Sequence, residues 1–276
     1  MFGTDTRLAE NAVTAAKRRG LPISPDIENA AGMYKVIVDA SHDPHPPRPT
    51  VADIPATPEQ LRARIEEQAT AKRHAEYVRS VAADYHQPLA SAYNQAVQAA
   101  VPGWIVSLQP KFDALVRALA GQAKKLPVDL RVEAMDWNDA RISAAWEKAE
   151  SAAHQLDQLV SDRQDMARAI GGDGGRDNEL YAVAKLPDPD EQAVFGHVMR
   201  DQIGPAIKEW KELRGQPVSR WLHLARSPHI DLILATPGEV TERAAAMQRW
   251  RDAIAAMHDA QGRNGAVTAV RQALAA

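Results

Sequence analysis

The stretch TPEQLRARIEEQATAKRHAEYVRSVAADYHQP, residues 57–88, decides the fold of this chain. Thr57 can cap a helix that begins at Pro58, because its hydroxyl accepts a backbone N–H of the first turn and proline has no N–H to satisfy. Neither proline nor glycine recurs before Pro88. The sequence therefore predicts one long helix of about 46 Å, at ~1.5 Å per residue.

Small and apolar residues follow this helix at alternating steps of four and three. They are Ala71, Ala75, Val78, Ala82, Tyr85, Leu89, Ala92, Ala96 and Ala99. This spacing predicts a heptad seam that other helices cover, because each alanine contributes only ~0.8 kcal/mol on burial. Pro88 predicts a kink or a junction between two helices around residues 86–88, since an interior proline costs a helix ~3 kcal/mol.

Two further helices are expected to cover that seam. Pro102 and Gly103 should restart the chain as a helix with a large apolar face, made of Trp104, Ile105, Leu108, Phe112, Leu115, Val116 and Leu119. Asp136 should cap a third helix that ends at Ile170. Its two heptad positions are Ile142, Ala149, Leu156 and Ile170, and Ala145, Ala152, Leu159 and Met166. Residues 57–170 are therefore predicted to form an antiparallel long-helix bundle with coiled-coil-like packing.

The N-terminal residues 1–43 are predicted to form a helical arm. Thr4 or Asp5 can cap a helix to Arg19, and MYKVIVDA, which starts at Met33, is expected to be a strand because it is rich in β-branched residues. Residues 44–58 contain six prolines, which indicates a semi-rigid linker and a domain boundary. The alternative interpretation is a ligand for a proline-recognition module.

The C-terminal residues 176–276 are predicted to form a second, smaller helical domain. Its expected helices are 188–214, capped by Asp188 and weakened at Gly204, then 218–226, 237–257 capped by Thr236, and a short helix from Ala266. Glycines precede the domain at positions 171, 172, 174 and 175. We expect a flexible connection there, because a phosphate-binding loop would also need a lysine and a hydroxyl, and a calcium-binding glycine–aspartate repeat would need better spacing.

Composition favours an all-α fold and excludes several functions. The 276 residues contain 5% aromatic residues and no cysteine, which rules out disulfides, thiolate metal sites and cysteine nucleophiles. A formal charge of -3, spread along the chain, argues against nucleic-acid binding, which requires a basic surface. We find neither a secretory-signal pattern nor an apolar run of membrane-spanning length, so we expect a cytoplasmic protein with no membrane association.

Three groups of residues could bind a metal ion. His223, His229 and Asp231 are the best set, because imidazole and carboxylate groups are common ligands and Ser227 with Pro228 could bend the chain between them. A second group, Glu147, Glu150, His154 and Asp157, falls on the outer face of the predicted helix, so a solvated surface is the preferred interpretation. The third, His42, Asp43 and His45, lies in or beside the flexible linker and cannot be preorganised.

The six tryptophans at positions 104, 137, 146, 210, 221 and 250 are expected to pack between helices. Trp210 and Trp221 could instead be exposed contacts for a partner. No catalytic motif is recognisable and no cofactor is predicted. The sequence favours a non-enzymatic interaction or assembly protein, such as a scaffold, that binds a protein partner or itself. The alternatives are an enzyme with a helical active site, metal-dependent through His223, His229 and Asp231, and a nucleic-acid-associated module.

Overall fold

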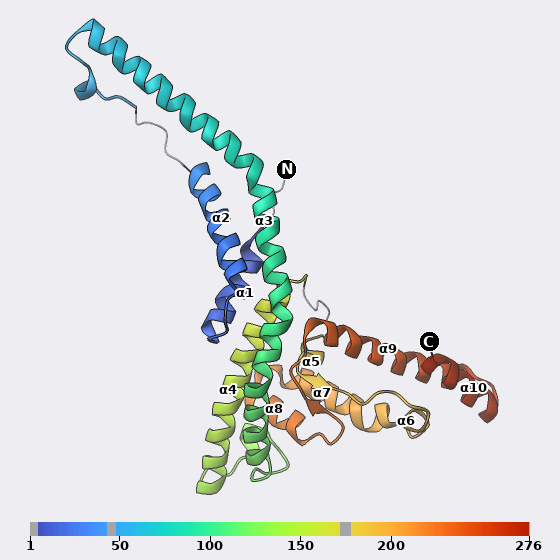
Figure 1. Cartoon of the computed structure of the whole chain (residues 1–276). Helices are drawn as coiled ribbons and strands as arrows, with labels where there is room; N and C mark the ends of the chain where they lie inside the picture. Colours follow the sequence, from blue (N-terminus) through green and yellow to red (C-terminus); the bar gives the residue numbers. More distant parts are fainter. Residues whose placement is uncertain (1–4, 43–47, 172–177, 276) are drawn as a thin grey trace. The chain divides into compact units, whose positions relative to one another are not determined.

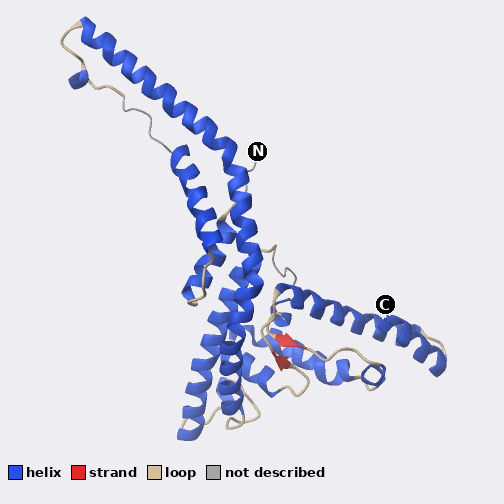
Figure 2. Cartoon of the chain, in the orientation of Figure 1, coloured by secondary structure: helices blue, strands red, loops and turns tan. Residues whose placement is uncertain are grey.

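The protein is all-α, as predicted from its composition. The computed structural model describes residues 5–42, 48–171 and 178–275. Within these ranges the chain consists of helices, the turns and loops that connect them, and one two-stranded sheet (Figures 1 and 2). The described residues fall into two compact units, Met1–Ala100 and Val101–Ala276. The long helix α3 (Pro58–Ala123) contributes to both units, so each unit is described separately below.

The first unit consists of helix α1 (Arg7–Arg18), helix α2 (Pro25–Ser41), a short 3-10 turn η1 (Val51–Asp53) and the first part of α3. One side of α1 is buried through Ala9, Ala12, Val13, Ala15 and Ala16. The helix ends close to the predicted position, because Gly20 adopts a left-handed conformation with a φ of 69° that suits glycine. The amide of Asn94 on α3 donates to the carbonyl of Asp5 at 3.2 Å.

The predicted strand at Met33 is wrong, because this segment lies inside α2. Ser24 caps that helix by accepting from the backbone of Ile27, and Pro25 occupies its first turn. The cap and the helical spacing of the buried residues Ile27 and Ala30 outweigh the weaker β-propensity of the segment that follows. Tyr34 then hydrogen-bonds His86 of α3 at 3.1 Å, which anchors α2 to the long helix within the first unit.

A junction between two helices near Pro88 and the predicted restart at Pro102 are wrong, because α3 continues through both residues and through Pro110. A kink at Pro88, the other outcome expected there, stays a prediction. All three prolines lie on the exposed side of the helix. Each removes one backbone hydrogen bond, but the carbonyl that it leaves on the outer side is open to water. The helix therefore loses less than it would at a buried proline.

The predicted seam is only partly buried. Ala75 and Ala82 are 5% and 4% exposed, whereas Tyr85 is 56% exposed. Beyond this point the buried positions shift to Ala90, Tyr93, Val97 and Val101 instead of the predicted Leu89, Ala92, Ala96 and Ala99. A straight helix with 3.6 residues per turn drifts away from a strict seven-residue repeat, so a register assigned at one end fails at the other.

The second unit begins with the rest of α3 and the helix α4 (Ala140–Arg168), which are separated by the 3-10 turn η2 (Val132–Ala134). Asp139 caps α4, three residues later than predicted. Most of the predicted apolar positions of both helices are buried, but Leu115, Val116 and Ile142 are intermediate and Ile170 is 38% exposed. Whether residues 57–170 pack as a regular coiled-coil-like bundle stays a prediction.

Short elements complete the second unit. They are α5 (Asn178–Tyr181), β1 (Ala184–Lys185), α6 (Glu191–Phe195), the π-helical turn η3 (Met199–Ile203), α7 (Gly204–Glu212), the 3-10 turn η4 (Leu213–Gly215), α8 (Pro217–Arg226), β2 (Asp231–Leu232), α9 (Pro237–Asp259) and α10 (Gly262–Ala275). Strands β1 and β2 pair antiparallel, with Ala184 opposite Leu232. The predicted helix 188–214 is thus divided into four shorter elements, α6, η3, α7 and η4, and the first is capped by Asp190 instead of Asp188.

Two predicted features of this unit are confirmed at the residue level. Thr236 caps α9 in a capping box, in which its hydroxyl and the Glu239 carboxylate each satisfy a backbone N–H of the other residue. Gly204 lies where the predicted helix 188–214 is interrupted, between the π-helical turn η3 and α7. An added Cβ at this position would lie 2.8 Å from the carbonyl oxygen of Met199. The π-helical turn therefore requires glycine at this position.

The C-terminal end of α3 is held by a side chain from α8. The Arg226 guanidinium donates hydrogen bonds to the carbonyls of Ala123, Leu126, Pro127 and Val128. Terminal carbonyls of a helix lack intrahelical partners, and a planar guanidinium can satisfy several of them together. Burial lowers the pKa of Arg226 from its ordinary value, although the group stays cationic.

Candidate functional site

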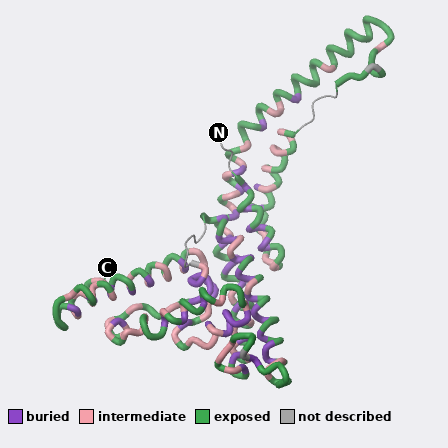
Figure 3. The backbone as a smooth tube through the Cα atoms, turned by 180° about the vertical axis from the view of Figure 1, so that it is seen from behind, coloured by how far each residue is buried: buried purple, intermediate pink, exposed green. Residues whose placement is uncertain are grey.

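An exposed apolar stripe on α3 is the most distinctive surface of the first unit. Tyr77, Val81 and Tyr85 are 73%, 53% and 56% exposed. They are spaced four residues apart, so they lie on one side of the helix, while the buried Ala75 and Ala82 lie on the other side. Figure 3 shows the first part of α3 mostly in the colour of exposed residues.

The same side of α3 continues toward the end of the first unit with small or uncharged residues. Pro88, Ala92, Gln95 and Ala99 follow at steps of three and four, and all are exposed. From Tyr77 to Ala99 the helix is about 34 Å long, at ~1.5 Å per residue. We refer to Tyr77, Val81, Tyr85, Pro88, Ala92, Gln95 and Ala99 as the α3 stripe.

Two opposite charges border the α3 stripe on one edge. Arg73 lies one turn before Tyr77, and Asp84 lies close to one turn after Val81. At ~100° per residue, both fall on the same side of the line through the stripe. Both are exposed, and the Arg73 Nε donates only to the carbonyl of Ala69 within its own helix. Within the described part of the chain, neither is held in an ion pair with another side chain.

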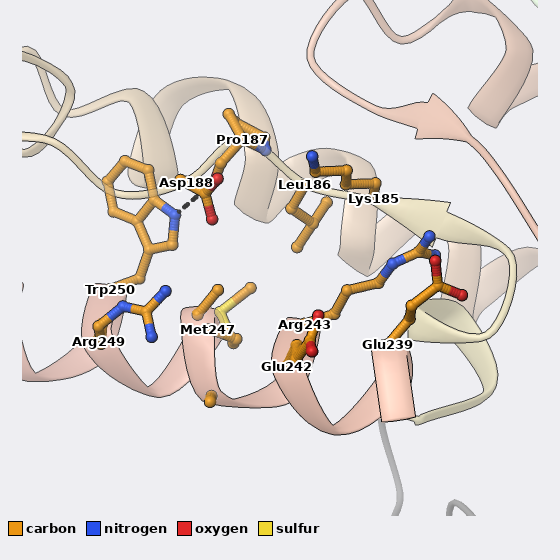
Figure 4. A pocket seen from close by; sticks show the side chains of 12 residues that line it. Lys185, Leu186, Pro187, Asp188, Glu239, Glu242, Arg243, Met247, Arg249 and Trp250 are labelled. Atoms are coloured by element: carbon orange, nitrogen blue, oxygen red, sulfur yellow. Dashed lines mark hydrogen bonds between the residues drawn. The ribbon is translucent and has the colours of Figure 1, made fainter. Parts of the chain in front are cut away.

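The second unit contains a cleft of about 440 Å³ between α9 and residues 185–188 (Figure 4). Its floor includes Trp250, whose indole N–H donates to the Pro187 carbonyl at 3.0 Å. Arg243 lines one end and donates to the carbonyls of Tyr181 and Ile233 at 2.8 and 3.0 Å. Burial lowers the pKa of Arg243 from its ordinary value.

The charges in this cleft do not select a ligand. Arg243 bonds the carbonyls beside it, and Glu239 is part of the capping box of α9. The remaining charged side chains are of both signs: Lys185 and Arg249 against Asp188 and Glu242. Anion and cation sites in proteins gather one sign of charge, so the cleft indicates no particular substrate.

The predicted metal ligands are not assembled. Among the described residues, no group of three or more histidine, cysteine or acidic side chains has an arrangement that could hold a metal ion. His223 lies on α8, His229 lies in the turn after it, and Asp231 begins β2, where it pairs with Lys185. A closing of this loop would be needed to make a three-ligand site.

His223 is half-buried instead. Its imidazole hydrogen-bonds the carbonyl of Ala206, and its Nε2 atom is buried with no hydrogen-bond partner in the structure. Burial lowers the pKa of His223, and the nearby Glu209 carboxylate opposes this effect only in part. Burial therefore favours the neutral form of this side chain.

The other two predicted groups are placed as follows. Glu147, Glu150 and His154 are exposed on α4, whereas the Asp157 carboxylate accepts a hydrogen bond from the Trp221 indole at 2.8 Å. His42 is exposed and its Nδ1 lies 2.7 Å from the carbonyl of Val38. Asp43 and His45 lie outside the described residues, as do Gly172, Gly174 and Gly175.

Trp210 and Trp221 lie in the interior of the second unit, where they are 3% and 1% exposed. Their rings meet edge to face at 5.4 Å, and Phe112 contacts Trp221 at 6.2 Å in the same manner. The Arg220 guanidinium stacks 3.4 Å over Trp210 and also donates to Glu179 at 2.8 Å. In this conformation neither tryptophan has the free area that a partner would contact.

Sequence reasoning missed the α3 stripe because Tyr85 was assigned to the buried seam. The signal was present, since Tyr77, Val81 and Tyr85 recur at steps of four. Two apolar stripes on one helix cannot both face the same neighbour, however, and only burial shows which of them is covered.

Comparison with protein families, with characterised protein sequences and with solved structures finds no significant match for this chain. The described helices also contain no apolar stretch long enough to cross a membrane.

Proposed function

We propose that this protein acts by binding another protein chain through the α3 stripe, as an interaction or assembly protein rather than an enzyme. The exposure of Tyr77, Val81 and Tyr85 on one side of α3 is the observation that carries the proposal. Its partner is either a different protein or a second copy of the chain. The expectation of a cytoplasmic location is part of the same proposal.

The exposed apolar side chains of the α3 stripe would gain free energy from burial against a partner. Burial of apolar surface contributes about 25 cal/mol per Å², so three large side chains on one helix face can anchor a contact. Tyrosine suits such a role, because its ring packs against apolar groups while its hydroxyl stays hydrated at the edge. Amphipathic helices commonly bind partners through anchors spaced three, four and seven residues apart.

The two other functions considered from the sequence have less support. A metal-dependent enzyme would require His223, His229 and Asp231 to converge, and the described residues do not bring them together. A nucleic-acid-associated module would require a basic field, whereas the chain carries a formal charge of -3. Neither alternative has an observation in its favour.

The test compares three forms of the full chain as bait in a lysate of the cells that produce it. The stripe variant carries Tyr77→Ser, Val81→Ser and Tyr85→Ser, and the control carries Val128→Ser, Val132→Ser and Ile170→Ser, which are also exposed apolar positions. We expect quantitative mass spectrometry to recover a partner, or untagged copies of the chain, with the wild type and the control. The stripe variant should recover at least tenfold less of the same partner.

Equal recovery by all three baits would contradict the proposal, as would the absence of any protein enriched by the wild type. Far-ultraviolet circular dichroism should show unchanged helix content in both variants, because all six replaced side chains are exposed.

A further inference from the structure

We infer that the partner of the α3 stripe is a second copy of this chain, and that the two α3 helices pair antiparallel about a twofold axis near residue 79. This inference rests on the proposed function and specifies its partner. It follows from the order of charges along the edge of the stripe, from the size of the residues that such pairing brings together, and from the length of helix that it covers.

The charge order favours an antiparallel pair. In this pair Tyr77 of one copy lies opposite Val81 of the other. The two helices run in opposite directions, so residues that precede Tyr77 in one copy face residues that follow Val81 in the other. Arg73 of each copy then lies beside Asp84 of the other, twice in the dimer. Both groups lie along the same edge of the stripe. In an antiparallel helix pair, this edge of one helix lies next to the corresponding edge of the other helix. Both are exposed and available for such an ion pair.

A parallel pair lacks this match. In parallel register Tyr77 faces Tyr77, and Arg73 and Asp84 come beside the partner residues around Val78 and Leu89, which are uncharged. The edge charges are then left without partners. Electrostatic complementarity of this kind sets the orientation of helix pairs more than their affinity.

The same register also matches side-chain sizes along the rest of the stripe. Ala92 and Ala99 come opposite Glu66 and Glu59 of the other copy, and Gln95 comes opposite Ala63, so a small residue faces a longer side chain at each position. No charged residue of the stripe edge comes opposite another of its own sign. The overlap of residues 59–99 extends over about 60 Å of each helix, at ~1.5 Å per residue. A contact about 10 Å wide along that length approaches the ~800 Å² per partner of a standard interface.

Within the first unit, the residues that pack against α3 contact the side of the helix opposite the α3 stripe. Ala75, Ala82 and Ala90 are buried there, and His86 contacts Tyr34 of α2 with ring centroids 5.3 Å apart. A second copy on the stripe therefore would not displace α2.

Cysteine cross-linking tests the orientation directly, because the chain has no cysteine of its own. Full-length Tyr77→Cys and Val81→Cys proteins are mixed, oxidised mildly and compared with each protein alone on a non-reducing gel. Since a disulfide needs Cα atoms within about 7 Å, the mixture should form a heterodimer several times faster than either protein forms a homodimer. Faster linkage of Tyr77→Cys to itself would overturn the antiparallel orientation.

Charge exchange tests the register independently. In sedimentation equilibrium, Arg73→Asp and Asp84→Arg should each weaken self-association about tenfold, because two edge pairs change from attraction to repulsion. The protein with both substitutions should recover the wild-type dissociation constant, whereas Lys111→Asp, an exposed change of equal charge outside the stripe, should leave it unchanged. If both single variants dimerise as the wild type does, the register is wrong.

The two proposals fail in different ways. A wild-type chain that stays monomeric at about 100 µM, yet loses a different partner when the stripe is changed, refutes the self-association and leaves the proposed function in place. A monomeric chain whose bait recovers no partner refutes both.

Discussion

At the scale of single residues, buried polar groups of the second unit are tied to backbone carbonyls. Arg243 and Arg163 both donate to the loops that flank β2, Arg163 through a 2.9 Å bond to Ala235. In the sequence, Arg163 occupies the heptad position of Ile142, Ala149, Leu156 and Ile170, where an apolar residue is expected. Its partner lies 72 positions away in the chain, so no local pattern could have shown why an arginine belongs there.

His223 gives the unfolding free energy a pH dependence. Burial lowers its pKa in the folded protein, with Glu209 raising and Arg226 further lowering it, so the folded state resists protonation more than the unfolded chain does. Its contribution to stability is complete above about pH 6.5 and is lost as the pH falls below that value. We expect the melting temperature to decrease between pH 7 and pH 5.

The measurement is a set of thermal melts across this pH range. His223→Asn, which keeps a donor near the position of Nδ1, should flatten the decrease, whereas His74→Asn at an exposed position should not change it. A wild-type curve that does not slope downward toward pH 5, or one that His223→Asn leaves as steep, would show that His223 is not held neutral.

At the scale of the element, one feature of α3 could be predicted from the sequence and another could not. Its start at Pro58 was predictable because a cap and an N-terminal proline act within one turn. Its passage through Pro88 and Pro102 was not, since the cost of a proline depends on whether the freed carbonyl meets water or protein. The helix α2 was missed for a related reason, because its cap at Ser24 lies nine residues before the segment that resembles a strand.

The buried side of α3 gives the prediction at this scale. Ala82 is 4% exposed, so Ala82→Leu should overpack its contacts and lower the free energy of unfolding by ~1–3 kcal/mol. The neighbouring Ala83 is exposed, and Ala83→Leu should change the stability by less than about 0.5 kcal/mol. Thermal melts of the two variants, run at two protein concentrations, provide the comparison. Equal midpoints would mean that Ala82 is not packed in solution.

At the scale of the whole molecule, the all-α class was predictable from composition, and the start of α9 was predictable from its cap at Thr236. The cap predicted at Asp188 was wrong, because Asp190 caps α6. The candidate site was not, because it depends on which of two apolar stripes of α3 remains uncovered. The metal site failed for a similar reason, since the chain distance from His223 to Asp231 says nothing of how the intervening turn is directed.

The proline-rich segment 44–58 is expected to be the first point of proteolytic attack. Brief digestion with a protease of broad specificity, such as proteinase K, should cut near Arg48, which is exposed outside regular structure, before it cuts within residues 62–79 of α3. A protease needs an extended backbone, and a helix must open before it is cut. Mass spectrometry of the early fragments identifies the site, and an earlier cut within 62–79 would contradict a stable helix there.

The hydrogen bonds from Arg226 to the end of α3 can form only after the ribosome has synthesised residue 226. The Arg226 guanidinium and the Ala123 carbonyl are 103 positions apart. At about 5–20 residues per second, the ribosome needs on the order of 5–20 s to make the intervening segment. For that interval the last turn of α3 has emerged without the cation that holds its carbonyls. A nascent chain arrested before residue 226 should therefore present a frayed α3 terminus, because its last carbonyls lack the partner that the finished protein provides.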